Sequence, residues 1–113
     1  MSDRFARTPE PPYYAVIFTN QHSGEDDAAY GRMAEKMVET AATMPGYLGV
    51  ESTRDADGLG ITVSCWESEE AIANWKAHAE HAFAQEKGKS TWYSHYELRV
   101  AKVERAYSGP EGR

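Results

Sequence analysis

The sequence predicts an α+β domain in which a four-stranded antiparallel sheet carries two helices on one face. Three observations lead to this prediction. The chain has 113 residues, the size of a single domain. Four segments rich in β-branched and aromatic residues alternate with two amphipathic segments, in the order strand, helix, strand, strand, helix, strand. Two β-α-β units of this kind, each skipping one strand, close into the ferredoxin-like arrangement.

The first half of the chain contributes one strand and one helix. The segment YYAVIFTN at 13–20 is aromatic and β-branched and predicts a buried strand. Apolar residues then recur three and four positions apart over 30–41, which is typical of an amphipathic helix. Asp26 or Asp27 is expected to cap this helix, and the Pro-Gly pair at 45–46 ends it.

The second half contributes a hairpin, a helix and a long strand. Two strands are predicted at 47–54 and 60–68, joined by the turn sequence DADG at 55–58. Ser68 is a suitable N-cap for the second helix, and the last strand is predicted over 92–107. The apolar stripe of the second helix consists of Ile72, Trp75, Ala79, Ala82 and Phe83.

Composition divides the chain into three parts. Residues 1–12 are polar and end in three prolines among four residues, so we expect a flexible arm. Residues 13–108 hold every predicted element and form the folded domain, and residues 109–113 form a polar tail. The single cysteine, Cys65, lies in an apolar run and is interpreted as a small buried side chain, so no disulfide framework is expected.

Charge and hydropathy exclude several classes of partner. Twelve basic and eighteen acidic side chains give a net charge of −6, whereas nucleic acids and anionic membranes require a basic surface. No apolar run approaches the ~18 residues that cross a bilayer, and the first twelve residues lack the apolar segment of a secretory signal. We therefore expect a cytoplasmic protein that binds neither nucleic acid nor membrane.

The predicted topology gathers polar and aromatic residues at one end of the domain. The first strand ends there at Asn20, the second helix rises toward it with His78, and the fourth strand begins there. We therefore predict a cleft between the second helix and the sheet, with Asn20 and His78 as its catalytic residues. The residues expected to bind a substrate are Phe18, Trp75, Tyr93 and His95.

Each of these candidates also has a purely structural interpretation. Asn20 is either a turn residue or an amide that binds a substrate oxygen, and Trp75 belongs either to the core or to the cleft wall. His78 is either solvated or an acid–base group, since the ordinary imidazole pKa of about 6.5 suits proton transfer. His81 is turned further toward solvent. The two histidines lack the spacing and the third ligand of a helical metal site, so we predict no metal.

Two segments resemble the antibiotic biosynthesis monooxygenase family, within the dimeric α/β-barrel superfamily. They are PGYLGVES at 45–52 and ITVSCWESEEAIANW at 61–75, and the similarity covers about residues 13–107. The resemblance implies a homodimer in which two sheets pack as one α/β barrel. It further implies oxygenation of a small electron-rich aromatic molecule, polyketide- or quinol-like, by O2 without a bound cofactor.

The resemblance leaves two alternatives open. Haem-degrading members use an asparagine and a tryptophan, which Asn20 and Trp75 match, and an iron-ligating histidine about three turns beyond the tryptophan. This chain has Gln85 and Glu86 at that place, and His78 is only one turn beyond Trp75. The other alternative is a non-catalytic dimeric protein that binds a small hydrophobic ligand.

Overall fold

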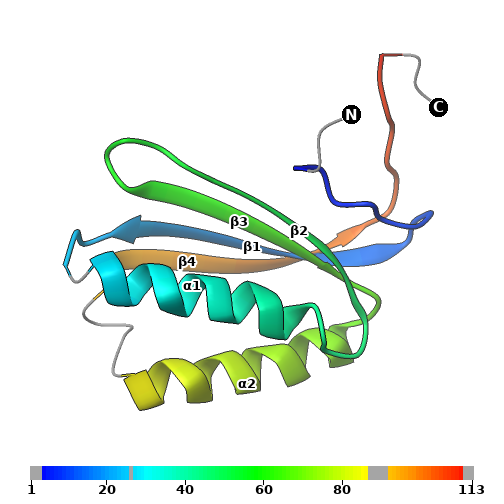
Figure 1. The fold of residues 1–113 in the computed structure, drawn as a ribbon. Helices are drawn as coiled ribbons and strands as arrows, with labels where there is room; N and C mark the ends of the chain where they lie inside the picture. Colours follow the sequence, from blue (N-terminus) through cyan, green and yellow to red (C-terminus); the bar gives the residue numbers. More distant parts are fainter. Residues whose placement is uncertain (1–3, 26, 87–91, 111–113) are drawn as a thin grey trace.

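The structure, a computed structural model, describes residues 4–25, 27–86 and 92–110, apart from the side chains of 27 and 83–86. Its elements are β1 (Tyr13–His22), α1 (Asp27–Ala41), β2 (Tyr47–Arg54), β3 (Leu59–Trp66), α2 (Glu69–Glu86) and β4 (Tyr93–Val103). The four strands form one antiparallel sheet in the order β2-β3-β1-β4, and both helices cover the same face (Figure 1). The predicted α+β, ferredoxin-like fold is confirmed.

The strands end where their partners end. The last strand is predicted over 92–107, but β4 stops at Val103, which pairs with Tyr13, the first residue of β1. Beyond that point β1 offers no backbone groups for pairing, so a favourable sequence does not extend the strand. The strand predicted over 60–68 also ends early, because β3 stops at Trp66 and α2 begins at Glu69. The Oγ of Ser68 accepts a hydrogen bond from the Ala71 N–H at 3.1 Å. Ser68 is therefore the N-cap of α2, as predicted.

A glycine turn joins α1 to β2 and brings the turn close to α2. Gly46 has a φ of 85°, a left-handed conformation that residues with a Cβ atom disfavour. A Cβ atom at this position would lie 2.6 Å from the Ala71 Cβ, so glycine also permits the close approach. The predictions of Asp26 as a helix cap and of the Phe83 side chain in the stripe of α2 lie outside the described part of the chain.

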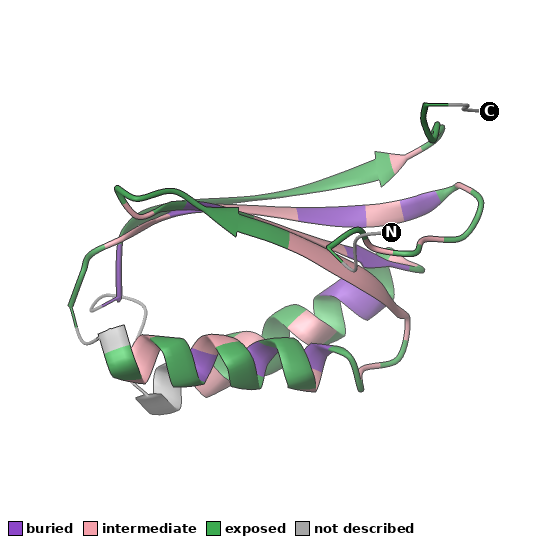
Figure 2. Cartoon of the chain, turned by 45° about the horizontal axis from the view of Figure 1, so that its top comes forward, coloured by how far each residue is buried: buried purple, intermediate pink, exposed green. Residues whose placement is uncertain are grey.

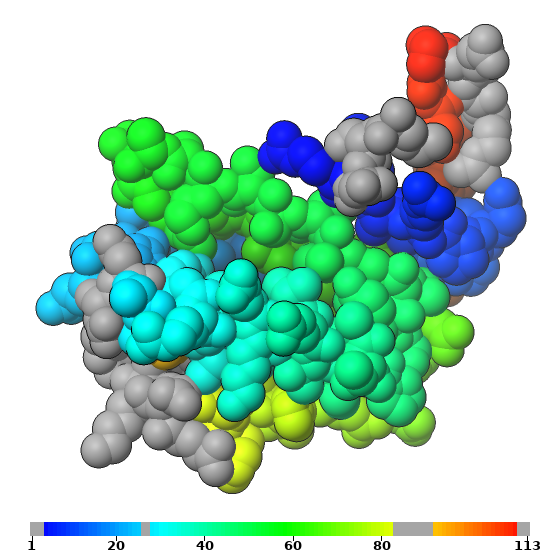
Figure 3. Space-filling model, viewed as in Figure 1, coloured from blue at the N-terminus to red at the C-terminus, as the bar shows by residue number. Residues whose placement is uncertain are grey.

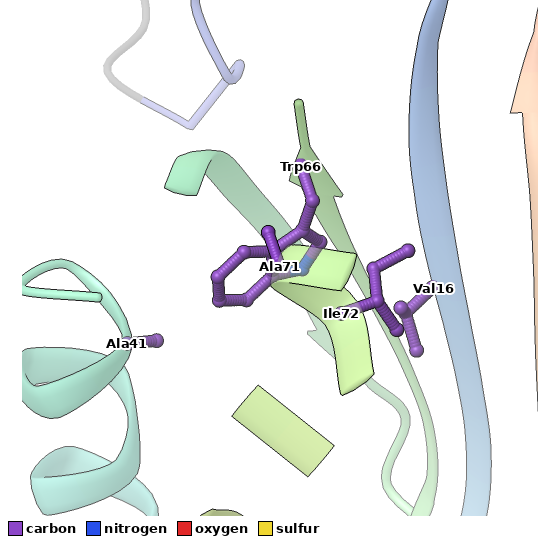
Figure 4. Packing of buried hydrophobic residues seen from close by; sticks show 5 residues of the cluster. All are labelled: Val16, Ala41, Trp66, Ala71 and Ile72. Atoms are coloured by element: carbon purple, nitrogen blue, oxygen red, sulfur yellow. The ribbon is translucent and has the colours of Figure 1, made fainter. Parts of the chain in front are cut away.

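The core lies where β3 leads into α2, between the sheet and the helices. Its largest member, Trp66, has no accessible surface, and its Nε1–H donates to Ser64 Oγ at 3.0 Å. The other buried members of this cluster are Val16, Ala41, Ala71 and Ile72 (Figure 4). A second cluster contains Met33, Met37 and Trp92. Trp75 packs against both clusters, so it links the two halves of the interior.

Apolar side chains remain uncovered on the sheet. The central strand β1 contains several buried residues, whereas the edge strand β4 is exposed along most of its length (Figure 2). The large exposed apolar residues of the sheet are Leu59 and Ile61 on β3 and Tyr96, Leu98 and Val100 on β4. A long edge strand with apolar side chains is typical of a surface that another chain covers. Within the described ranges, neither helix has the length and apolar character needed to cross a lipid bilayer.

Part of the N-terminal arm contacts β2. The Ala6 N–H donates to Glu51 Oε2 at 2.9 Å, and a Cβ atom at Gly49 would lie 2.8 Å from the Ala6 Cβ. Ala6 therefore has a defined place beside β2. The flexibility of the whole arm, 1–12, stays a prediction, and residues 1–3 lie outside the described part.

Candidate functional site

A cavity of about 950 Å³ lies between the helices and the sheet. All six elements contribute to its lining, together with Arg4 from the arm. Its aromatic and larger aliphatic lining residues include Val16, Phe18, Met37, Trp75 and Tyr93. Small-molecule sites usually enclose roughly 300–1,000 Å³ and are mostly apolar with a few placed polar groups. The cleft predicted between the second helix and the sheet is therefore present, with the dimensions of a small-molecule site.

Asn20 lines the cavity from the end of β1. Val16, Phe18 and Asn20 alternate along the strand and share the face that looks toward the helices. Asn20 is only 2% exposed; its Oδ1 accepts a hydrogen bond from Arg54 Nη2 at 2.7 Å, and its Nδ2 donates to Phe18 O at 3.3 Å. A guanidinium group can only donate, so the amide oxygen must face Arg54. One N–H of Nδ2 is left over from these two bonds.

Arg54 reaches Asn20 across an intervening strand. Arg54 pairs with Gly60 of β3, and Gly60 pairs with Asn20 of β1, so the three residues form one row across the sheet. Two strand spacings of about 4.8 Å separate the ends of this row, a distance that an arginine side chain spans. A Cβ atom at Gly60 would lie 2.7 Å from Arg54 Cζ. The guanidinium of Arg54 therefore occupies the space that the Cβ atom of any other residue at position 60 would need.

Tyr30 of α1 contacts the same guanidinium. Arg54 Nη2 donates to Tyr30 Oη at 2.6 Å, Arg54 Cζ lies 5.4 Å from the centre of the tyrosine ring, and Arg54 Nη1 donates to Gly58 O. In Figure 3 the β2–β3 hairpin, in green, stands over the beginning of α1, in cyan, which agrees with this contact. We call Asn20, Tyr30 and Arg54 the polar cluster. Among the described residues, no carboxylate pairs with Arg54.

Tyr93 joins the polar cluster to the aromatic wall. Its ring lies edge-on to Phe18, with centroids 5.4 Å apart, and to Tyr30, with centroids 5.7 Å apart. Its hydroxyl donates a long hydrogen bond, 3.5 Å, to Tyr30 Oη. Burial, with smaller contributions from Tyr30, raises the pKa of Tyr93 far above its ordinary value, against the opposing charge of Arg54. The phenol therefore stays protonated and acts as a hydrogen-bond donor.

Trp75 lines the cavity, whereas His78 does not. The half-buried Trp75 ring stacks on Trp66 at 6.0 Å and on His78 at 5.8 Å, and His78 is exposed. The residues of α2 that line the cavity are Trp75, Lys76, Ala79 and Glu80. At about 100° per residue these four centre roughly 130° around the helix from His78. The cavity therefore lies to one side of the apolar stripe, and His78 lies on the other side.

The remaining histidine candidates also lie outside the lining. His95 is exposed, and its Nε2 lies 2.8 Å from Glu97 Oε2; His81 is exposed on α2. The described residues contain no group of three or more histidine, cysteine or acidic side chains arranged to hold a metal ion. Of the predicted site residues, the structure thus brings Asn20, Phe18, Trp75 and Tyr93 together at one cavity, without His78 and His95.

Sequence reasoning does not identify Arg54 or Tyr30 as site residues. The apolar periodicity of the first helix assigns Tyr30 to the stripe, and no local motif marks Arg54. The hairpin register is the signal that could have revealed Arg54. In the structure the hairpin register places Arg54 opposite Gly60, and strand pairing places Gly60 beside Asn20. A long basic side chain beside a glycine then has room to cross the strand.

The chain resembles known proteins in sequence and in fold. It is 59% identical over 105 residues to the uncharacterized protein YqjZ of Bacillus subtilis, covering 93% of this chain and 91% of that protein. It is 29% identical over 94 residues to the jasmonate monooxygenase ABM of Pyricularia oryzae, covering 80% of this chain but only 43% of that protein. The chain therefore spans less than half the length of this second relative.

Solved structures show the same fold at low sequence identity. PA3566 from Pseudomonas aeruginosa aligns with a TM-score of 0.65 at 15% identity, over 87% of this chain and 98% of that one. Rv0793 from Mycobacterium tuberculosis aligns with a TM-score of 0.65 at 14% identity, over 87% and 99% of the two chains. The model of the family described as antibiotic biosynthesis monooxygenase matches residues 13–87, well over half of the chain. The protein therefore belongs to the antibiotic biosynthesis monooxygenase family.

Proposed function

We propose that this protein is a cofactor-independent monooxygenase that acts on a small electron-rich aromatic molecule, polyketide- or quinol-like, with O2. The observation that carries this proposal is the cavity of about 950 Å³, in which an aromatic and aliphatic wall surrounds the buried amide of Asn20. Phe18, Trp75 and Tyr93 offer ring surfaces to an aromatic substrate. Membership of the monooxygenase family supports the type of reaction.

The substrate itself must supply the electrons in such a reaction, because no ordinary side chain reduces O2. For a methylene group between electron-rich rings, one methylene and one molecule of O2 give one carbonyl group and one molecule of water. The carbon gives four electrons to O2; one oxygen atom becomes the carbonyl oxygen and the other leaves as water with the two methylene hydrogens. The reaction begins when the methylene loses a proton and its electron pair delocalises onto a ring oxygen, which becomes an enolate or phenolate. This anion then reacts with O2.

The residues of the cavity suit the stabilisation of that anion. The free N–H of Asn20 can donate to the developing oxyanion, and Arg54 fixes the orientation of the amide. Fixed donors in a site with little water stabilise developing charge more than donors in bulk water do. The aromatic wall holds the ring system in place. We assign His78 no direct contact with the substrate, because it lies outside the cavity lining.

Haem degradation has less support in this cavity. Among the described residues that line it, none is a histidine or cysteine that could ligate haem iron in the common ways. Titration with haem tests this alternative, because ligation of the iron at the site would shift and sharpen the Soret band of free haem. Measurement of O2 uptake distinguishes a non-catalytic binding protein from the proposed monooxygenase and from a haem-degrading enzyme.

Oxygen uptake tests the proposed reaction. We expect O2 consumption when the purified protein, treated with a metal chelator, is mixed with a panel of anthrones and hydroquinones. With ¹⁸O2, mass spectrometry should find one labelled atom in the carbonyl product and the other in water. A panel member that binds, as shown by quenching of tryptophan fluorescence, without any O2 uptake across the panel would contradict the proposal and favour the non-catalytic binder.

We expect the protein to form a homodimer through its sheets. The exposed Leu59 and Ile61 lie on the face opposite the helices, because they alternate with Gly60, which shares the face of Asn20. Light scattering after size exclusion should therefore give twice the protomer mass of 12.6 kDa. Ile61→Glu should weaken the dimer, since a carboxylate would be buried in the contact. A single 12.6 kDa species at micromolar concentration would show that the expectation is wrong.

A further inference from the structure

The charge of the cavity lining differs in sign from that of the whole chain. The chain carries eighteen acidic and twelve basic side chains, whereas the described residues of the lining include two acidic and three basic ones. The charged lining residues are Glu51, Glu80, Arg4, Arg54 and Lys76. Glu80 pairs with Lys76 at 2.8 Å, and Glu51 accepts the Ala6 N–H. A positive charge in the lining of an acidic protein favours an acidic ligand.

Arg54 is the basic group whose position is best defined. Its three hydrogen-bond partners among the described residues, Asn20 Oδ1, Tyr30 Oη and Gly58 O, are all neutral acceptors. A guanidinium group has five N–H donors, so two remain beyond these three bonds. The three contacts fix the position of the charge without neutralising it. An arginine held in this way is prepared to bind an anionic oxygen, for which guanidinium geometry is well suited.

Tyr30 strengthens this interpretation. Its hydroxyl oxygen accepts hydrogen bonds from Arg54 Nη2 at 2.6 Å and from the Tyr93 hydroxyl at 3.5 Å. Because both of its lone pairs are used, its own proton is available to a third group. The free N–H of Asn20 lies in the same cluster. The polar cluster therefore offers several donors around one fixed positive charge, a combination that selects an anion over a neutral polar group.

We propose that Arg54 and Tyr30 of the polar cluster bind an ionised oxygen group of the substrate, a carboxylate or a phenolate, while the aromatic body lies in the cavity. Asn20 holds Arg54 in place, and its remaining N–H is left for the oxyanion that develops in the reaction. The identification of this anion as the substrate rests on the proposed oxygenase function, but the anion site itself does not. Arg54 is a specificity-determining residue in this proposal. Gly60 is a positioning residue, because its missing side chain leaves the space in which the guanidinium lies.

Non-oxidisable probes test the site independently of catalysis. We expect 2-naphthoate to bind the wild-type protein about tenfold more tightly than 2-naphthamide, which has the same rings and no charge. This ratio is modest for a charge-assisted contact because Arg54 is exposed and its charge is screened by salt. Arg54→Gln should reduce the ratio to near one, with little change in the affinity for the amide. Arg32→Gln is the matched control, since Arg32 is exposed on α1 outside the lining and the net charge changes equally.

Gly60→Ala tests the position of Arg54 without removing its charge. Gly60 has no left-handed φ, so alanine fits the backbone, but the new Cβ must displace the guanidinium from Asn20. We expect a loss of selectivity for 2-naphthoate that approaches the loss in Arg54→Gln, with circular dichroism unchanged. A second readout uses 4-nitrophenol, whose anion absorbs visible light. The wild type should lower the apparent pKa of the bound phenol, and Arg54→Gln should not.

These outcomes separate the anion site from the proposed reaction. If Arg54→Gln keeps the selectivity for 2-naphthoate, or if Arg4→Gln alone abolishes it, the assignment to Arg54 is overturned even where O2 uptake is found. If Arg54→Gln abolishes the selectivity in a protein that consumes no O2, the anion site stands and only the oxygenase proposal fails.

Discussion

Replacement of Asn20 by alanine is expected to lower the turnover number by roughly 10²–10³-fold on a substrate identified by O2 uptake, the usual effect of removing one oxyanion donor. The amide is buried in the cavity wall and keeps one N–H beyond its bonds to Phe18 and Arg54. The loss should appear in kcat rather than in binding, because the oxyanion develops only as the reaction proceeds. The free energy of unfolding should fall by about 1–3 kcal/mol, since both side-chain hydrogen bonds of the amide are lost.

Two further variants show which part of the Asn20 amide matters. Asn20→Asp keeps an oxygen that accepts the Arg54 hydrogen bond but has no N–H to donate. If donation is the catalytic contribution, this variant should be as slow as Asn20→Ala, although Arg54 keeps its partner. Thr19→Ala is the control on the same strand, because Thr19 lies outside the lining. A turnover number within about threefold of wild type in Asn20→Ala would exclude an oxyanion role for this amide.

The strand and helix pattern was sufficient to predict the fold because each element carries its own signal. The β-branched run before Asn20, the turn at 55–58 and the Ser68 cap each specify local structure, and together they allow few topologies. The lengths of the strands were less predictable. Whether β4 continues past Val103 depends on whether a partner strand is present, and Tyr13 ends that partner. Pairing of this kind is a property of two distant segments.

Only those residues of the candidate site whose orientation follows from strand or helix periodicity could be predicted from the sequence. Alternation along β1 and the stripe of α2 correctly indicate that Phe18 and Trp75 face the interior. His78 lies at the edge of the same stripe, and the sequence does not show that the cavity opens on the opposite edge, beside Lys76 and Glu80. Arg54 was missed for a related reason. Its contribution depends on the absence of a side chain at Gly60, one strand away.

Replacement of Trp66 by alanine is expected to reduce the free energy of unfolding by about 3–5 kcal/mol. Trp66 has no accessible surface, stacks on Trp75 at 6.0 Å and lies edge-on to Tyr47 at 5.6 Å. Removal of the ring leaves a cavity between two rigid layers that cannot fully collapse. Urea unfolding should show a lower midpoint with an unchanged slope. Samples must be compared at equal protomer concentration if the protein is a dimer.

Control substitutions distinguish the loss of packing at Trp66 from other effects. Trp66→Phe keeps an aromatic ring in the core and should cost less than Trp66→Ala, although Ser64 Oγ loses its donor. Tyr107→Ala should change stability by less than about 0.5 kcal/mol, because this tyrosine is 73% exposed. The loss in Trp66→Ala should extend to the site, since Trp75 packs on Trp66 and also lines the cavity. A cost below about 1.5 kcal/mol would mean that the surrounding layers close over the missing ring, and the interior would then be more adaptable than its packing indicates.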